Sequence, residues 1–315
     1  MGGGIETAGI EHLRVMRPLA QLVAFYDGRV PGYRFSERPN WVDDGALALG
    51  ICTYALVDGP DAVVFDTHVS PEHGARIRAT LAELGARRFV VVLSHWHLDH
   101  VAGTGAFGDC EVVASRLTAE RLTRDRTAIE HGRLEGPPGI SPLVLPTTLV
   151  DERHSFACGG LTIELIRFAI HSADGMALHV PELDLLLAGD MLEDTVTYVS
   201  EADALETDLV ELERLRGLGS RIFPDHGSPE RIAAGGYDMT LIDATSRYLR
   251  DLLLACDEPT RRERDLRSFV ADQLAAGWLD YFEPYERVHR ENVKAVLDAR
   301  SRLTTARPGL ATDLG

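Results

Sequence analysis

The chain has 315 residues, 45% of them apolar and 26% charged, so it can bury a substantial core as one large domain or as one domain with an extension. Its formal net charge of −17 disfavours nucleic acid and anionic membranes as partners, because their phosphates repel an acidic surface. The four cysteines lie far apart and form no CxxC pair, which argues against a thiolate metal site and suits a reducing compartment.

The N-terminal stretch MGGGIETAGIEHLRVMRP lacks the basic and apolar regions of a signal peptide. The longest nearly apolar run, residues 46–57, is too short to cross a bilayer. We therefore expect a cytoplasmic protein without a membrane partner. Residues 25–35, with Trp41 beyond them, are aromatic and rich in Gly and Pro, which makes them a candidate for the rim of a site or for a homodimer contact.

Residues 48–235 show the pattern of short strands and helices separated by turns. Residues 48–59 and 61–67 are predicted to be two strands of a hairpin, joined by an Asp-Gly turn. Residues 71–87 carry Ile77, Leu81 and Leu84 at helical spacing and contain a glycine stop. Further strands are predicted at residues 87–94, 110–115, 161–168, 175–181, 183–189 and 221–227.

A change of character follows Gly235 and Gly236. Beyond them, residues 239–256, 260–277 and 284–303 are predicted to be helices. The prediction is thus an α/β protein with a catalytic domain at residues 1–235 and a helical C-terminal extension at residues 236–315. The aromatic residues of 278–285, Trp278 and Tyr281 among them, either cover a substrate cleft or pack between helices.

The turn after the predicted strand 87–94 is dense in metal-ligating side chains. Within SHWHLDHVAG (94–103) these are His95, His97, Asp99 and His100. Neutral imidazole and carboxylate are ligands of first-row divalent metals. Loops that leave a rigid sheet converge on one site, and three more ligands follow other predicted strands: His171, Asp190 and His226. This set is large enough for two metals that share one carboxylate.

These motifs resemble those of the metallo-β-lactamase-fold hydrolase superfamily, including its hydroxyacylglutathione hydrolase and lactonase-like members. The pattern appears as DT (66–67), SHWHLDH (94–100), His171, GD (189–190) and DHG (225–227), so the resemblance covers residues 48 to about 230. It implies a four-layer αββα sandwich with two divalent metal ions at one edge. Zinc is the expected metal, with iron and manganese as alternatives.

The resemblance also implies a role for each ligand. His95, His97 and His171 would hold the first metal. Asp99, His100 and His226 would hold the second, and Asp190 would bridge both. We also expect Asp66 to hydrogen-bond a ligand imidazole, as metal-binding histidines commonly require, although a solvated carboxylate at a strand end is the alternative.

Two further positions, His68 and Tyr198, lie close to the motifs. The family usually has glycine where this chain has His68, and we expect a surface histidine there, with an imidazole at the mouth of the site that touches substrate as the alternative. Tyr198, eight residues past Asp190, either places a phenol near the metals or packs as a strand aromatic in the body. Asp66, Asp99 and Tyr198 are therefore the candidate catalytic residues.

The ligand set implies a hydrolase for a small-molecule substrate, in which a metal-bridging hydroxide attacks the carbonyl of a thioester, lactone or ester. The sequence contains no GxSxG motif, which would indicate a serine nucleophile instead. The chain lacks the length and basic charge of the nuclease relatives, and the signal peptide of secreted β-lactamases is not evident. Alternatives are an iron-dependent redox protein of the same fold, a β-lactam or phosphoester hydrolase, and a metal-stabilised binding protein.

Overall fold

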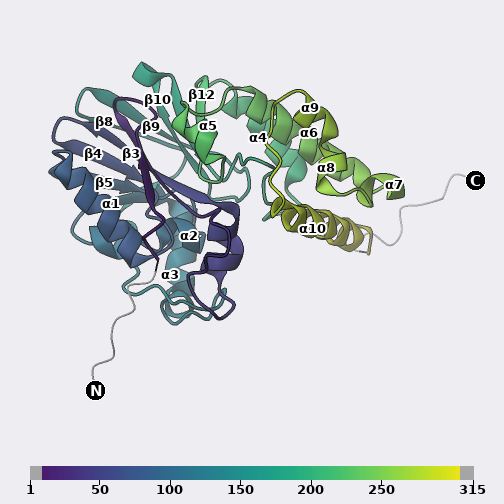
Figure 1. The fold of residues 1–315 in the computed structure, drawn as a ribbon, viewed down its shortest axis with the longest axis horizontal. Helices are drawn as coiled ribbons and strands as arrows, with labels where there is room; N and C mark the ends of the chain where they lie inside the picture. The colour runs from purple at the N-terminus through teal and green to yellow at the C-terminus, as the bar shows by residue number, and fades with distance from the viewer. Residues whose placement is uncertain (1–8, 306–315) are drawn as a thin grey trace, which may run out of the picture.

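Two β-sheets packed face to face form the centre of the structure, a computed structural model that describes residues 9–305 (Figure 1). The first sheet has seven strands in the order β1-β2-β3-β4-β5-β6-β7. They are β1 (Arg14–Met16), β2 (Leu22–Asp27), β3 (Ile51–Asp58), β4 (Asp61–Phe65), β5 (Arg88–Val92), β6 (Glu111–Ser115) and β7 (Thr148–Val150). The second sheet has five strands in the order β12-β11-β10-β9-β8. They are β8 (Arg153–Cys158), β9 (Leu161–Arg167), β10 (Met176–Val180), β11 (Leu185–Gly189) and β12 (Arg221–Pro224).

Helices cover both outer faces of the pair of sheets. The α-helices are α1 (Pro71–Glu83), α2 (Leu98–Val101), α3 (Arg116–Glu130), α4 (Leu205–Leu215), α5 (Pro229–Ala233), α6 (Thr240–Ala255), α7 (Pro259–Arg262), α8 (Leu266–Phe269), α9 (Ala271–Ala275) and α10 (Tyr285–Thr305). Three short turns of other helix types are η1 (Val42–Leu47), η2 (Thr104–Phe107) and η3 (Pro181–Leu183).

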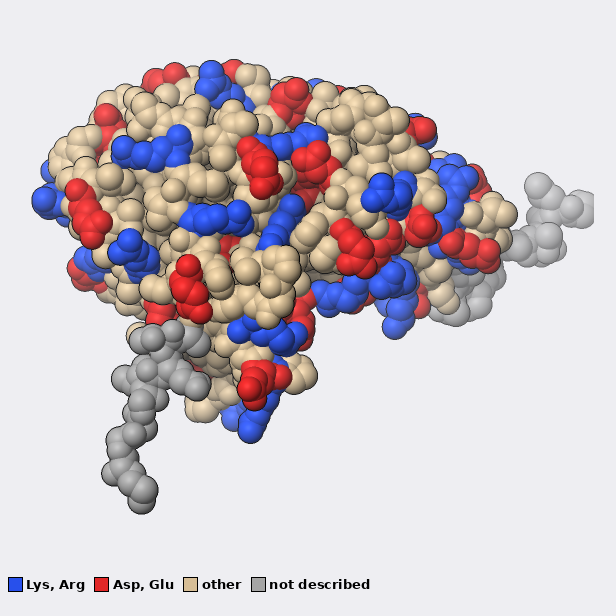
Figure 2. Space-filling view, in the orientation of Figure 1, with Lys and Arg blue, Asp and Glu red and all other residues tan. Residues whose placement is uncertain are grey.

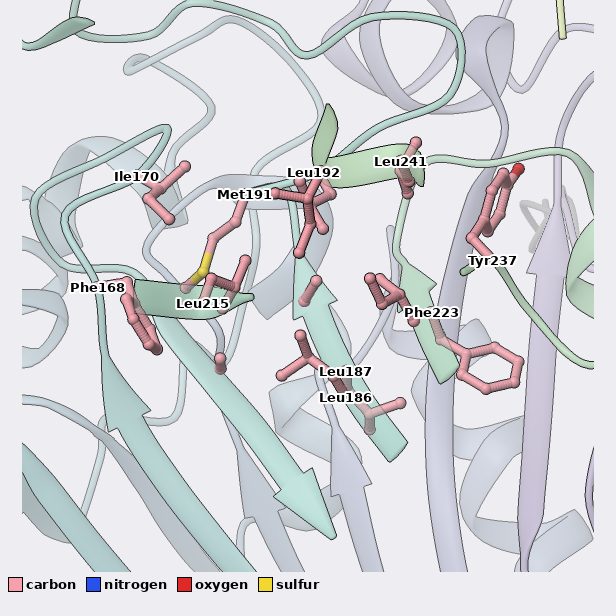
Figure 3. Close-up of a cluster of buried hydrophobic side chains, with 14 of the residues drawn as sticks. Phe168, Ile170, Leu186, Leu187, Met191, Leu192, Leu215, Phe223, Tyr237 and Leu241 are labelled. Carbon is pink, nitrogen blue, oxygen red and sulfur yellow. The ribbon is translucent and has the colours of Figure 1, made fainter. Parts of the chain in front are cut away.

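The layers follow from the alternation of side chains along each strand. In β3, Cys52, Tyr54 and Leu56 are fully buried against the second sheet. Ala55 points the other way, into a second core that the helices α1 and α3 close over the first sheet. Residues of α4, α5 and α6 pack on the outer side of the second sheet, where Leu215 and Leu241 join the cluster around β11 and β12 (Figure 3). The predicted four-layer αββα sandwich is confirmed.

Local signals explain where α1 begins and ends. Ser70 caps the helix by accepting a hydrogen bond from the N–H of His73, and Pro71 occupies the first helical position. Ile77 and Leu81 face the core, as their spacing predicts. The hairpin prediction is also confirmed, because β3 and β4 pair antiparallel.

The C-terminal region differs from the prediction in one helix. Residues 260–277 do not form one helix but the short helices α8 and α9 after the end of α7. Asp265 causes the interruption, because its side chain accepts a hydrogen bond from the N–H of Ser268 at 2.8 Å and starts a new helix. The predicted helices at 239–256 and 284–303 correspond to α6 and α10.

The helical extension does not stand apart from the sandwich. Tyr248 of α6 and Val296 of α10 belong to the same buried cluster as the strands of the second sheet. The domain boundary at residue 235 stays a prediction, and the outermost residues of both predicted domains lie outside the described part of the chain. Among the described residues, we find no helix with the length and apolar character needed to cross a membrane.

Candidate metal centre

All seven predicted ligands come together at one edge of the sandwich. Their ligand atoms form two groups, each within 4.8 Å: His95, His97, His171 and Asp190 in the first, and Asp99, His100 and His226 in the second. Each side chain sits at or just beyond the end of a strand. The turn after β5 supplies the HxHxDH residues, while His171, Asp190 and His226 follow β9, β11 and β12.

Asp190 connects the two groups. Its Oδ2 lies 3.6 Å from Nε2 of His95 and 3.8 Å from Nε2 of His171, both in the first group. The same oxygen lies 3.2 Å from Nε2 of His100 and 3.6 Å from Nε2 of His226, both in the second. A single carboxylate therefore faces imidazole nitrogens from both groups, as a bridging ligand must.

The first group suits a divalent cation. Burial lowers the pKa of His95 well below its ordinary value and that of His97 to about 3, so both imidazoles are neutral, which is the form that binds metal. Nδ1 of His97 lies 2.9 Å from Nε2 of His95 and 3.1 Å from Nε2 of His171. The buried Oδ1 of Asp190 has no hydrogen-bond partner. Converging lone pairs and an unpartnered carboxylate oxygen fit a bound metal ion.

The second group is richer in negative charge. Burial opposes protonation of His100, yet the carboxylates of Asp190, Asp99 and Asp66 raise its pKa well above the ordinary value. In the same way burial opposes the charged form of His226, but Asp190 and Asp99 raise its pKa to about 10. These carboxylates create a field that favours positive charge, and a divalent cation satisfies that demand.

Hydrogen bonds fix the far side of several of these rings. Nδ1 of His171 faces the carbonyl oxygen of Tyr198 at 3.0 Å, and Nδ1 of His226 faces the carbonyl oxygen of Gly50 at 2.7 Å. Both carbonyls require an N–H at Nδ1, so Nε2 carries the lone pair that points toward the other ligands. Such partners set the tautomer of metal-binding histidines.

Asp66 occupies the position that the motif predicts. Its Oδ2 lies 2.9 Å from Nδ1 of His100, and its Oδ1 accepts the N–H of Ser94 at 2.7 Å. The alternative of a solvated carboxylate is wrong, because Asp66 is only 1% exposed. Sequence reasoning missed a second carboxylate here, since Oδ2 of Asp225 also lies 3.1 Å from Nδ1 of His100. The only signal was its place beside His226 in the DHG motif.

The backbone at the site adopts conformations that side-chain-bearing residues rarely take. Asp66, His68 and His171 have φ angles of 67°, 69° and 67°. Such strain persists where the surrounding structure imposes it, and it concentrates at functional sites. Gly189, at φ 54°, precedes Asp190 where a Cβ would lie only 3.0 Å from Cβ of Ser94. A glycine therefore suits the close approach of β11 to the HxHxDH turn.

The expected surface position of His68 is wrong. The ring is fully buried and stacks on His73 at 4.3 Å between centroids, and Nε2 of His73 lies 3.0 Å from Oδ2 of Asp27. Strand β2, which the sequence reasoning did not identify, delivers Asp27 to this place. The His68 ring thus belongs to a buried polar cluster beneath the site.

A cavity of about 480 Å³ opens over the ligands. Its wall combines ligand side chains with Trp41, Trp96, Tyr198 and residues of α10. Tyr198 lies in the loop after β11, not in a strand, and is 41% exposed. Trp278 and Tyr281 do not line this cavity but pack against the core, so the C-terminal helices reach the site through α10 alone.

Two residues that link α10 to the metal ligands were also missed. Burial raises the pKa of Glu193 to about 7, and its carboxyl accepts hydrogen bonds from the N–H of Tyr198 at 2.7 Å and the hydroxyl of Tyr285 at 3.2 Å. Asn292 of α10 is fully buried and bonds the same loop. Neither residue lies in a recognisable motif, because its role depends on a contact between distant segments.

Curated relatives match part of the chain. A "Beta-lactamase-like protein 2 homolog" of Caenorhabditis elegans is 27% identical over 181 residues, which are 56% of this chain and 56% of that protein. An "Atrochrysone carboxyl ACP thioesterase" of Aspergillus fumigatus is 27% identical over 218 residues, 68% of this chain and 62% of that protein. The chain thus covers less than two thirds of the length of each of these relatives.

Solved structures share the fold. A metallo-beta-lactamase from Pontibacter korlensis is similar with a TM-score of 0.56 at 19% identity, covering 76% of this chain and 99% of that one. The DIM-1 metallo-beta-lactamase is similar with a TM-score of 0.56 at 15% identity, covering 76% and 97%. A family model described as the metallo-beta-lactamase superfamily matches residues 48–226, more than half of the chain. The chain belongs to the metallo-beta-lactamase superfamily.

Proposed function

We propose that the protein is a dinuclear metal-dependent hydrolase that cleaves an acyl substrate at its carbonyl carbon, and that the substrate is a thioester. The observation that carries the proposal is the position of Asp190, whose Oδ2 lies within 3.8 Å of imidazole nitrogens from both ligand groups. A single-metal site needs only about four ligands, so a shared carboxylate between two groups supports two metals.

The ligand roles follow this division. His95, His97 and His171 hold one metal, Asp99, His100 and His226 hold the other, and Asp190 is shared. Two divalent cations, with zinc as the expected metal, would supply an activated water near neutral pH and a Lewis acid for the carbonyl oxygen. Asp66 fixes the orientation of His100, and the histidines hold their rings through their Nδ1 partners.

We propose that the side chain of Tyr198 contacts the substrate. Burial raises the pKa of its phenol above the ordinary value, so the hydroxyl stays protonated at neutral pH. A protonated phenol on the cavity wall can donate a hydrogen bond to the oxygen on which charge develops. The ring centroid lies 6.1 Å from that of His171, which puts the phenol beside the ligands without making it one of them.

Two observations support a thioester over other acyl groups. The relative from Aspergillus fumigatus is named a thioesterase. The cavity offers Trp41, Trp96, Leu49 and Val288 as apolar wall for an acyl chain or a sulfur leaving group. Thioesters also need little assistance from a general acid, since a thiolate leaves more readily than an alkoxide.

The test is a panel of thioesters, lactones, carboxylic esters, β-lactams and phosphoesters, assayed with zinc-loaded and manganese-loaded enzyme. We expect the highest kcat/KM with a thioester. A preference for phosphoesters or β-lactams by at least about tenfold, a difference of about 1.4 kcal/mol in transition-state stabilisation, would contradict the substrate class. An iron-dependent absorption band together with no hydrolysis of any substrate would contradict the hydrolase itself.

Asp66→Asn tests the positioning of His100. The amide keeps the shape of the side chain but removes the charge that faces Nδ1 of His100. We expect metal affinity or kcat/KM to fall by about 10- to 100-fold, the range typical of such supporting residues. Competition with a chromophoric chelator measures the affinity, and Asp203→Asn, at an exposed aspartate, is the control. Wild-type affinity and kinetics in Asp66→Asn would show that the carboxylate does not serve the site.

Asn292 links α10 to the ligand His171. Its Oδ1 accepts the N–H of Val199 and its Nδ2 donates to the carbonyl of Thr197, each at 2.8 Å. Between these two residues, the carbonyl of Tyr198 faces Nδ1 of His171. Asn292 therefore fixes the backbone on both sides of Tyr198, whose carbonyl orients the ligand His171.

Asn292→Ala should lower metal affinity by about 10- to 100-fold, because the Tyr198 carbonyl loses its support and His171 loses its fixed orientation. Tyr248→Phe is the matched control. This change removes only the hydroxyl that accepts a hydrogen bond from Nδ2 of Asn292 at 3.0 Å. It should therefore lower the melting temperature with little effect on metal affinity. Equal metal affinities in the two variants, with similar losses of stability, would show that Asn292 contributes to packing and does not position His171.

A further inference from the structure

A second concave site adjoins α10. The cavity over the metal ligands uses Arg287, Val288 and Glu291, whereas a hollow of about 350 Å³ uses Arg290, Lys294 and their neighbours. With 3.6 residues per turn, the two sets lie on adjoining sides of the helix, and Arg287 and Lys294, seven residues apart, lie on nearly the same side. The hollow is completed by Arg262 at the end of α7 and by Arg264 just after it. We call this site, lined by Arg262, Arg264, Arg290 and Lys294, the basic hollow.

The four cations of the basic hollow lack acidic partners. Among the described residues, no carboxylate forms an ion pair or a hydrogen bond with their side chains, and the buried Nε of Arg262 has no hydrogen-bond partner at all. The neighbouring Arg261 shows the contrast, since it is 2.6 Å from Asp251 and 2.8 Å from Glu258. Asp298 is the one acidic residue in the lining.

An anion would complement the charge of this arrangement. Four like charges around one hollow repel one another, and the chain has carboxylates in excess, with a net charge of −17. On the face drawn in Figure 2, acidic and basic side chains are interspersed over most of the surface. Basic side chains gather at the lower edge of the helical region, where Figure 1 places α10.

The shape of the basic hollow restricts the anion. It is concave, and Val293 and Leu297 give it an apolar floor between the charged groups. Arginine and lysine are the side chains that bind phosphate most readily. An apolar floor beside phosphate-binding cations suits a heterocyclic base. We propose that the basic hollow binds a nucleoside phosphate, with the phosphates on the cations and the base on Val293 and Leu297.

Its relation to the metal ligands gives the nucleotide a role, which rests on the proposed function. The two sites share α10, and Arg287 of the cavity over the metals lies seven residues, or about 10 Å along the helix axis, from Lys294 of the basic hollow. A thioester whose thiol is attached through an extended linker to a nucleoside phosphate, as in coenzyme A, could place its phosphates in the hollow and its carbonyl beside the metals. The hollow would then select the carrier and the cavity would select the acyl group.

Isothermal titration calorimetry of the metal-loaded protein with adenosine 3′,5′-bisphosphate tests the site without any reaction. We expect one saturable site, weakened roughly 10- to 100-fold in Arg290→Gln/Lys294→Gln, because each lost phosphate contact is a charge-assisted hydrogen bond. Glutamine keeps the helix propensity of α10, and Arg290→Glu/Lys294→Glu should remove binding altogether. Arg153→Gln is the control, because Arg153 is an exposed cation on β8 that does not line the basic hollow. This variant should bind the nucleotide like the wild type. Inorganic phosphate, which lacks the base, should bind more weakly.

His95→Ala separates this site from the metal ligands, since phosphates also bind metals. Loss of the calorimetric signal in His95→Ala, or its persistence in the Arg290/Lys294 variants, would overturn the proposal. Binding of an acidic carrier protein at these cations without binding of the nucleotide would overturn it as well. Nucleotide binding as expected, together with no hydrolysis of a coenzyme A thioester or of a thioester without phosphates, would retain the basic hollow and refute the proposed function.

Discussion

Asp190→Asn is expected to lower kcat/KM by about three orders of magnitude and to remove at least one metal ion per chain, because several kcal/mol of catalysis depend on the metals. Asp190 is 6% exposed, and its Oδ2 faces nitrogens from both ligand groups. The amide is nearly isosteric with the carboxylate but cannot supply the negative charge that two cations share. Steady-state kinetics and elemental analysis of the same preparation measure both effects.

The control for Asp190→Asn is Asp203→Asn, which makes the same chemical change at an exposed aspartate. It should keep wild-type kinetics and metal content. If Asp190→Asn retained two metal ions and lost less than about tenfold in kcat/KM, a change under about 1.4 kcal/mol, the carboxylate would not be a bridge.

His95→Ala is expected to abolish measurable turnover while leaving the protein folded. The ring contacts polar groups at the edge of the sandwich, with Nδ1 of His97 at 2.9 Å and the hydroxyl of Ser94 at 2.8 Å. Because a metal that binds only the folded state adds stability, adding a chelator should lower the melting temperature of the wild type. The same chelator should have a much smaller effect on His95→Ala.

Differential scanning calorimetry with and without chelator measures this difference. His131→Ala, at an exposed histidine near the end of α3, should behave as the wild type does. Insoluble or unfolded His95→Ala protein would make the metal structural. Wild-type turnover in His95→Ala would remove this residue from the ligand set.

The predictable part of the site is the part encoded by local spacing. His95, His97, Asp99 and His100 follow one apolar strand, and that strand's register alone places them on one turn. Apolar runs that end on a polar residue likewise indicated Asp190 and His226. Buried strands and the ends of parallel strands are robust signals, because a shift by one residue would turn apolar side chains toward solvent.

The residues that were missed act across long stretches of chain. Asp225 reaches His100 over 125 residues, and Asn292 reaches Val199 over 93. No local pattern encodes such contacts, since they exist only after both sheets and α10 have packed. His68 was misjudged for a related reason, because the partner that holds its neighbour His73 is Asp27 on an unpredicted strand.

The edges of the fold were the other weak point. The edge strands β1, β7 and β8 are short or only half apolar and were not identified. The apolar strand β2 and the helices α3 and α4 were also missed, although β2 and α4 carry clear apolar patterns. Strand β8, for example, is an edge strand with alternating exposure, so few of its side chains carry an apolar signal. Cytoplasmic localisation and the homodimer contact near residues 25–35 stay predictions.

Metal stoichiometry tests the central claim most directly. The protein is stripped with a chelator, reloaded with excess zinc, freed of unbound metal by gel filtration and analysed by inductively coupled plasma mass spectrometry. Two groups of ligands that share Asp190 predict about two zinc ions per chain, since one tetrahedral site would use only about four ligands. One tightly held ion with an empty second site after reloading would contradict a dinuclear hydrolase.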